Sequence, residues 1–195
     1  FSVTVTDANG CTGSSSITSV TVNPNPAAPT VTASGSTTFC EGGSVTLTSS
    51  ATNGNAWSNG ATSQSITADS SGSYSVTITD GNGCTASSAA TTVTVNSLPN
   101  ATITASGATT FCSGGSVTLS VFAANSYNWN NAQTTQSITV NSSGTFTVTV
   151  TDANGCSGTS SQVVTVNANP AIPSITQAGN NLACSVSGMS NYVWQ

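Results

Sequence analysis

The most reactive residues of this chain are its six cysteines: Cys11, Cys40, Cys84, Cys112, Cys156 and Cys184. An even number of cysteines favours a framework of disulfides. Metal binding is the competing interpretation, but the sequence has neither a CxxC pair nor a histidine to support it. We therefore expect disulfides, and we expect neither a metal site nor a cofactor.

Several residue types that carry catalysis are missing. The chain of 195 residues has no lysine, arginine or histidine, and its five acidic residues are Asp7, Glu41, Asp69, Asp80 and Asp152. Histidine-dependent nucleophile pairs, phosphate clamps and nucleic-acid binding by charge neutralisation are therefore excluded. No carboxylate pair suggests glycosidase chemistry. We expect no catalytic residue and no enzyme. The 35 serines, 35 threonines and 20 asparagines make the chain soluble through hydroxyls and amides.

The aspartates Asp7, Asp80 and Asp152 each begin a D-x-N-G sequence. Aspartate and asparagine oxygens suit Ca²⁺, but one carboxylate per loop is too little for a tight site, and we expect plain turns. The sequence also has N-x-S/T acceptors for glycosylation at Asn100 and Asn141.

Internal repeats decide the organisation of the chain. The sequence FSVTVTDANGC begins at Phe1, YSVTITDGNGC begins at Tyr74, and FTVTVTDANGC begins at Phe146. A second block, TTFCxGGSVTL, surrounds Cys40 and again Cys112. The period is therefore about 72 residues, and proline-bearing segments that read as short, semi-stiff linkers separate the repeats.

This period divides the chain into two whole modules, 29–95 and 101–166, and two partial ones. Residues 1–22 correspond to the last two strands of a preceding module, and residues 173–195 correspond to the first strands of a following module. A half module leaves strand edges unpaired. Either the chain is a fragment of a longer protein, or neighbouring copies complete each other by strand complementation.

The sequence pattern of every module indicates β-structure. Runs such as SVTLTSS and ATTVTVN alternate apolar with polar residues, which is typical of strands with one buried face. Turn residues separate about seven such runs, so we expect an all-β chain of tandem immunoglobulin-like β-sandwiches in a rod-like array. For the first whole module the expected strands are 30–39, 45–50, a strand around Trp57, 64–68, 74–80 and 90–95.

The predicted core of that module consists of Val31, Val45, Leu47, Trp57, Ile66, Tyr74, Val76, Ile78, Val93 and Val95. Trp57, Trp129 and Trp194 recur at equivalent positions, and we expect them between the sheets. Tyr74 follows a Ser-Gly turn, where a sandwich can form a tyrosine corner. A sandwich of about 70 residues has a small core, so the module needs covalent staples or neighbouring modules to be stable.

The cysteine pairing follows from sandwich geometry. Cys40 would lie at the turn between the first two strands and Cys84 in the last hairpin, at opposite ends of the module. A six-residue strand already spans about 20 Å, whereas a disulfide needs Cα atoms within about 7 Å. Modules stacked head to tail satisfy this limit through Cys40–Cys156, and Cys11, Cys84 and Cys112 would then bond to modules outside this chain. Counting back from Trp194 places Cys184 at the position of Leu119, facing the core, either as a buried free thiol or paired with a cysteine outside this chain.

The pattern FCxGGSVTL…W…SGxYxVTVTDxNGC resembles the PKD-like and immunoglobulin-like modules of large secreted surface proteins of gliding bacteria, many of them type IX secretion substrates. The last piece departs from it because it lacks the FCxGG block. The resemblance implies an extracellular, cell-surface location, and it names no ligand. No stretch of the sequence approaches 18 consecutive apolar residues, so we expect no membrane insertion. We expect a structural repeat segment of a stiff stalk, adhesin shaft or filament, with its own copies or adjacent modules as partners. The alternative is a carbohydrate- or surface-binding (adhesive) module attached to a secreted protein, with surface glycans as its partners.

Overall fold

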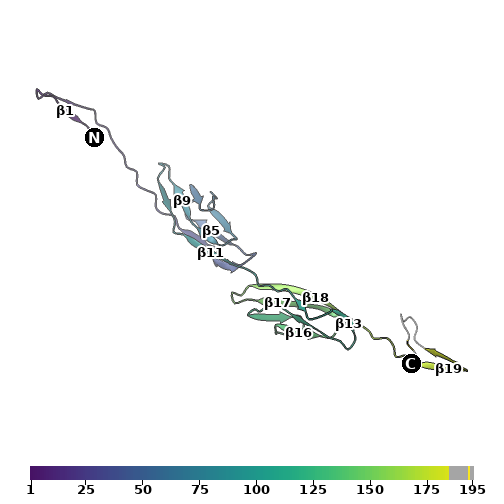
Figure 1. Cartoon of the computed structure of the whole chain (residues 1–195). Helices are drawn as coiled ribbons and strands as arrows, with labels where there is room; N and C mark the ends of the chain where they lie inside the picture. The colour runs from purple at the N-terminus through teal and green to yellow at the C-terminus, as the bar shows by residue number, and fades with distance from the viewer. Residues whose placement is uncertain (185–192, 194–195) are drawn as a thin grey trace. The chain divides into compact units, whose positions relative to one another are not determined.

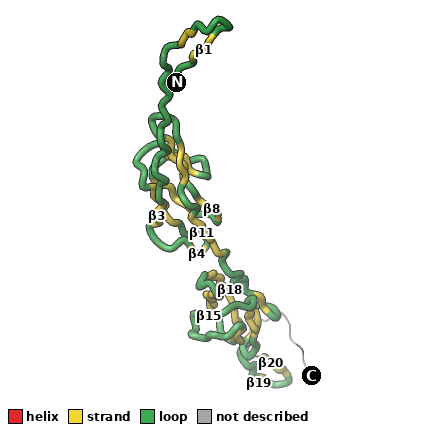
Figure 2. The backbone as a smooth tube through the Cα atoms, turned by 90° about the vertical axis from the view of Figure 1, so that its left-hand side faces the viewer, coloured by secondary structure: helices red, strands yellow, loops and turns green. Residues whose placement is uncertain are grey.

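The structure, a computed structural model, describes residues 1–184 and residue 193. The chain forms two compact units, Phe1–Ser97 and Leu98–Gln195. All secondary structure in the described residues is β-strand, which confirms the all-β prediction (Figure 2). Among these residues, no helix is long and apolar enough to cross a membrane.

The first unit contains an isolated hairpin and a β-sandwich (Figure 1). Its strands are β1 (Thr4–Thr6), β2 (Thr12–Ser14), β3 (Val31–Ala33), β4 (Thr38–Cys40), β5 (Val45–Ser49), β6 (Asn55–Trp57), β7 (Ser65–Ala68), β8 (Gly72–Tyr74), β9 (Val76–Thr79), β10 (Thr85–Ser87) and β11 (Thr91–Asn96). The hairpin pairs β1 with β2. One face of the sandwich is β3-β5-β7, and the strands of the other pair as β4-β11-β8 and β10-β9-β6.

The second unit repeats the sandwich with longer strands. Its strands are β12 (Thr104–Ala105), β13 (Thr110–Cys112), β14 (Val117–Ser120), β15 (Ser126–Trp129), β16 (Ser137–Val140), β17 (Gly144–Thr151), β18 (Ser157–Asn167), β19 (Ile175–Ala178) and β20 (Asn181–Cys184). One sheet is β12-β14-β16 and the other is β13-β18-β17-β15. A separate hairpin pairs β19 with β20.

The first strand of the first sandwich differs from its prediction. We expected one strand over 30–39, but the chain forms β3, which pairs with β5, and then β4, which pairs in parallel with β11 in the other sheet. The intervening Ser-Gly-Ser segment lets the chain change sheets, because glycine and serine favour turns. This change of sheet carries the FCxGG block to the end of β11.

The last hairpin of the first sandwich is interrupted. Thr77 pairs with Ser87, and Tyr74 pairs with Thr91. The segment from Ser87 to Thr91 is therefore one residue longer than the segment from Tyr74 to Thr77 that it pairs with. This extra residue is a β-bulge, and it separates β8 from β9 and β10 from β11. The expected strand 74–80 is therefore divided between β8 and β9, whereas the expected strand 90–95 corresponds to β11. In the second unit β17 and β18 pair without interruption.

The predicted core is largely confirmed. Val45, Leu47, Trp57, Ile66, Tyr74, Val76 and Val93 are buried, and Val31 and Val95 pack against them from partly buried positions. Ile78 is only half-buried, whereas its counterpart Val150 is fully buried. The hydroxyl of Tyr74 donates a hydrogen bond of 3.0 Å to the Ser70 carbonyl, so the expected corner is present.

Candidate functional site

The cysteines separate into two chemical states. Cys40 and Cys156 are disulfide-bonded. Cys11, Cys84, Cys112 and Cys184 are free thiols. A pairing within either whole module, Cys40 with Cys84 or Cys112 with Cys156, is therefore not formed.

Cys40 lies at the corner from which the chain leaves the first sandwich. It ends β4 and pairs with Asn96, the last residue of β11. The FCxGG block builds this corner, because Gly42 has a φ of +89°, a backbone conformation that residues with a side chain rarely adopt. The amide of Gly43 then donates a hydrogen bond of 3.0 Å to the Cys40 carbonyl. The motif thus fixes a cysteine beside the outgoing chain.

The same corner of the second sandwich carries Cys112, which pairs with Asn167 at the end of β18. Two residues later, the side chain of Asn169 donates a hydrogen bond of 3.1 Å to the Ser113 carbonyl. This bond holds the outgoing chain against the corner. In both sandwiches the chain therefore leaves the last strand beside a cysteine.

Cys156 lies at the opposite end, in the turn that precedes β18. One carboxylate oxygen of Asp152 accepts hydrogen bonds from the amides of Asn154, at 2.8 Å, and Cys156, at 2.9 Å. Gly155 supplies the positive φ of the turn, +80°. The equivalent pairs of bonds are made by Asp7 and Asp80 in the other two turns. The aspartates thus organise the turns that position the cysteines.

These bonds give each of the three aspartates a structural role in its turn. In the part of the chain that the structure describes, no three metal-ligating side chains cluster. One oxygen of each carboxylate accepts two backbone N–H groups, which is an ordinary use of aspartate in a turn.

The length of β18 explains why the cysteines of one module cannot pair. Cys112 lies opposite Asn167 at one end of this strand, and Cys156 immediately precedes its other end. Its 11 residues span about 36 Å at 3.3 Å per residue. A disulfide requires Cα atoms within about 7 Å.

Cys184 occupies a different position from the one expected. Ile175 pairs with Cys184, just as Val31 pairs with Ser49 in the first sandwich. Cys184 is therefore equivalent to the buried Ser49, two residues from the predicted position and on the same face of its strand. The count back from Trp194 runs through residues outside the described part of the chain, whereas the register is set by β19 and β20.

The tryptophans are part of the cores. Trp57 is 3% exposed and Trp129 is 1% exposed. Their indole N–H groups donate hydrogen bonds of 2.8 and 2.9 Å to the carbonyls of Ser63 and Thr135. Trp194 lies outside the described residues.

Both glycosylation candidates are exposed. The side-chain oxygen of Asn100 accepts a hydrogen bond of 2.9 Å from the Thr102 amide, whereas Asn141 follows directly after β16.

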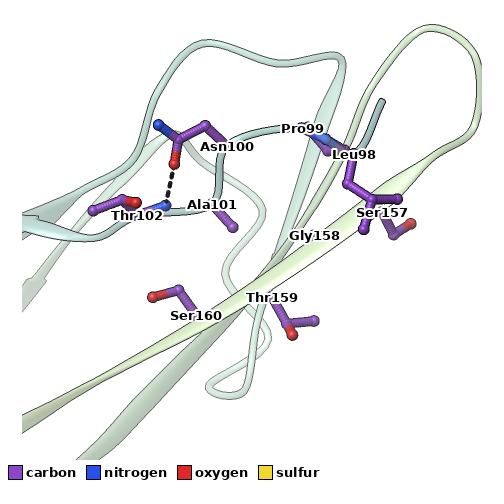
Figure 3. Close-up of a pocket in the computed structure, with 9 residues that line it drawn as sticks. All are labelled: Leu98, Pro99, Asn100, Ala101, Thr102, Ser157, Gly158, Thr159 and Ser160. Carbon is purple, nitrogen blue, oxygen red and sulfur yellow. Dashed lines mark hydrogen bonds between the residues drawn. The ribbon is translucent and has the colours of Figure 1, made fainter. Parts of the chain in front are cut away.

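A groove in the second unit was not anticipated. It has a volume of about 430 Å³ and lies between the incoming segment Leu98–Thr102 and the first residues of β18, Ser157–Ser160 (Figure 3). A Cβ atom on Gly158 would lie only 2.4 Å from the Pro99 carbonyl oxygen. The available signal was the repeat alignment, in which Gly158 stands where the first sandwich has Ala86.

No protein-family model and no curated protein matches the chain. One similar solved structure is described as a Ca²⁺-stabilized adhesin that helps an Antarctic bacterium reach out and bind ice; it is 20% identical, with a TM-score of 0.40 and 89% of this chain covered. The alignment spans 58% of that structure's own length.

A 1.5-MDa bacterial ice-binding adhesin is 17% identical with a TM-score of 0.33, over 86% of this chain and 74% of its own. Murine CEACAM1b is 13% identical with a TM-score of 0.32, over 72% of this chain and 99% of its own. Similarities this low transfer neither a ligand nor an activity.

Proposed function

We propose that this chain is a structural segment of an extracellular bacterial surface protein, in which disulfides join small β-sandwich modules in series into a stiff stalk or filament. The observation that carries the proposal is the state of the cysteines. Cys40 and Cys156 are disulfide-bonded while their counterparts are free, so we assign them to each other.

Chain connectivity supports this pairing. Cys40 lies beside Asn96, where the chain leaves the first sandwich. Three residues later the chain reaches Pro99, which packs against Gly158, two residues beyond Cys156. Three residues span at most about 11 Å. The two cysteines are therefore joined by a short tether, which is compatible with a bond between them.

The same rule extends the series beyond this chain. Cys84 is equivalent to Cys156, and its sulfur lies 3.9 Å from the carbonyl oxygen of Asn23 in the incoming segment. We propose that Cys84 bonds to the FCxGG cysteine of a preceding module, and that Cys112 bonds to the hairpin cysteine of a following one. Cys11 would bond in the same direction as Cys84.

The isolated first hairpin supports completion by another segment. Val3 and Val5 are 61% and 64% exposed, whereas their counterparts Val148 and Val150 are fully buried beneath the opposing sheet. Burial of each such side chain contributes about 1.5–3 kcal/mol. We propose that the first strands of an adjacent module or a second copy cover this face.

The buried tryptophans favour a structural role over glycan binding. Sugar-binding faces present aromatic rings to solvent, but Trp57 and Trp129 are inside the sandwiches. Among the described residues, Phe1 and Phe122 are the exposed aromatic side chains.

Disulfide mapping tests the pairing. Trypsin cannot cut a chain without lysine or arginine, so the oxidised protein is digested with pepsin under non-reducing conditions. We expect a peptide pair that joins Cys40 to Cys156. A pair joining Cys40 to Cys84 would contradict both the pairing and the mechanical role.

Small-angle scattering then tests stiffness, with the Cys112→Ser variant as a control for cysteine loss. The oxidised protein should fit a single arrangement of its units, and the reduced protein should require an ensemble. Equal flexibility before and after reduction would contradict a stalk stiffened by disulfides.

A further inference from the structure

We propose that Gly158 is a positioning residue that seats the incoming linker on the second sandwich and thereby sets the geometry in which Cys40 and Cys156 bond. This inference rests on the proposed disulfide between the modules. It assigns a role to a residue that has no reactive group, in a groove formed by the second unit alone (Figure 3).

The first step is the close approach of the linker. Gly158 pairs with the buried Val150, so both residues face the inside of the sandwich. A Cβ on Gly158 would lie 2.4 Å from the Pro99 carbonyl oxygen and 3.5 Å from the Cβ of Ala101. Ala101 itself is buried. The linker therefore closes this end of the sandwich directly over the glycine.

The second step is that glycine is required here for space and not for conformation. Gly158 is in a strand, and its φ is not in the left-handed region that other glycines of the chain adopt. The atom that a side chain would meet is a backbone oxygen, which cannot rotate away. The linker would have to retreat by about 1 Å to restore an ordinary contact of 3.4 Å.

The first sandwich provides an internal comparison. It has Ala86 in place of Gly158, and its incoming linker is longer: six positions separate Asn23 from the buried Pro29, against five from Asn96 to Ala101. The shorter linker thus goes with the glycine and the longer one with the alanine. This is expected if a shorter linker must take the direct path across the strand.

The third step connects the linker to the cysteines. Pro99 contacts Gly158, which is two residues, or about 6.6 Å, from Cys156. At the other end of the linker, Asn96 is the register partner of Cys40. Seating Pro99 on Gly158 therefore fixes the span between the two sulfurs. A displaced linker would lower their effective concentration, because that quantity depends on how well the tether matches the span.

The chemistry of the test is thiol–disulfide exchange with glutathione. Oxidised glutathione accepts the two electrons, so that two protein thiols become one disulfide and two molecules of reduced glutathione are released. The equilibrium constant of this exchange measures the effective concentration of the Cys40–Cys156 pair. It is determined on the full chain by acid quenching, thiol blocking and non-reducing peptide mapping.

We expect Gly158→Ala to lower this constant by about 10-fold or more relative to the unmodified chain. Inserting one alanine after Ser97 in the same variant should restore it, because this recreates the alanine and longer linker of the first sandwich. Ser161→Thr is the matched control, since it also adds one methyl group to β18 but at an exposed position outside the groove, and it should leave the constant unchanged.

Thermal unfolding of each variant under reducing conditions shows whether the second sandwich still folds, and the constants are compared at temperatures where it does. If Gly158→Ala keeps the constant within twofold, or if the insertion restores nothing, the positioning role is wrong while the proposed stalk stands. If the unmodified chain shows no Cys40–Cys156 bond, the proposed function itself fails.

Discussion

Replacing Cys40 by serine should destabilise both sandwiches, because the proposed disulfide restricts the unfolded state of each. When only the second sandwich unfolds, Cys40 stays beside Asn96, and the bond closes a loop of the 60 residues from Asn96 to Cys156. Loop-closure entropy for this length corresponds to about 4 kcal/mol at 25 °C. The value is similar when only the first sandwich unfolds, since 59 residues then separate Cys40 from Pro99.

Native disulfides commonly contribute about 2–5 kcal/mol. For domains of this size 1 kcal/mol shifts the Tm by about 4–8 °C. We therefore expect Cys40→Ser to lower the Tm by about 10 °C or more in calorimetry of the oxidised protein. Reductant should lower the Tm of the unmodified chain by the same amount and should not affect the variant.

The matched control is Cys112→Ser, which removes the equivalent cysteine, a free and exposed thiol. This substitution should change the free energy of unfolding by no more than about 0.5 kcal/mol. If Cys40→Ser and Cys112→Ser lower the Tm equally, the bond does not restrict the unfolded modules and the reasoning is refuted.

Three further substitutions test the parts that position the cysteines. Tyr74→Phe removes the hydrogen bond to Ser70 and should cost the first sandwich about 1 kcal/mol, measured by hydrogen exchange of the β8 and β11 amides; unchanged exchange would show that the corner is not stabilising. Leu119→Ala empties a fully buried site and should cost the second sandwich about 2–5 kcal/mol in denaturant unfolding, whereas Val163→Ala, at 58% exposure, should be nearly neutral. Asp152→Ala leaves two amides without their acceptor and should cost about 1–3 kcal/mol, whereas a chelator should not shift the Tm of the unmodified chain; a chelator-sensitive Tm would restore the calcium interpretation.

Much of the fold could be predicted because the repeats carry strong local signals. Alternating residues identified the strands that contain Leu47 and Val93, and the recurring tryptophans identified the centres of the cores. The change of sheet between β3 and β4 could not be read in this way, because both segments have the same strand-like pattern. Which sheet a segment joins depends on its partner, and that information is non-local.

The candidate site likewise has one part that could be predicted from the sequence and one part that could not. The cysteine states follow from a geometric argument, because strand length alone separates Cys112 from Cys156. The role of Gly158 was missed, because a glycine in a strand has several explanations until the approaching backbone is seen. The one-residue difference in linker length was visible in the sequence, but it has meaning only beside the substitution of glycine for alanine.

The absence of basic residues bears on the proposed disulfide joints of this chain. Without lysine, arginine or histidine, no ion pair between side chains can form. The outer faces instead carry cross-strand hydroxyl pairs, such as Thr77 with Ser87 at 2.8 Å and its counterpart Thr4 with Ser14 at 2.7 Å. Such pairs contribute about 0.2–1 kcal/mol each, which is comparable to exposed ion pairs but insensitive to salt. They stabilise a sheet but cannot hold two small sandwiches in a fixed relation, and the cysteines at the ends of the modules are the residues suited to that task.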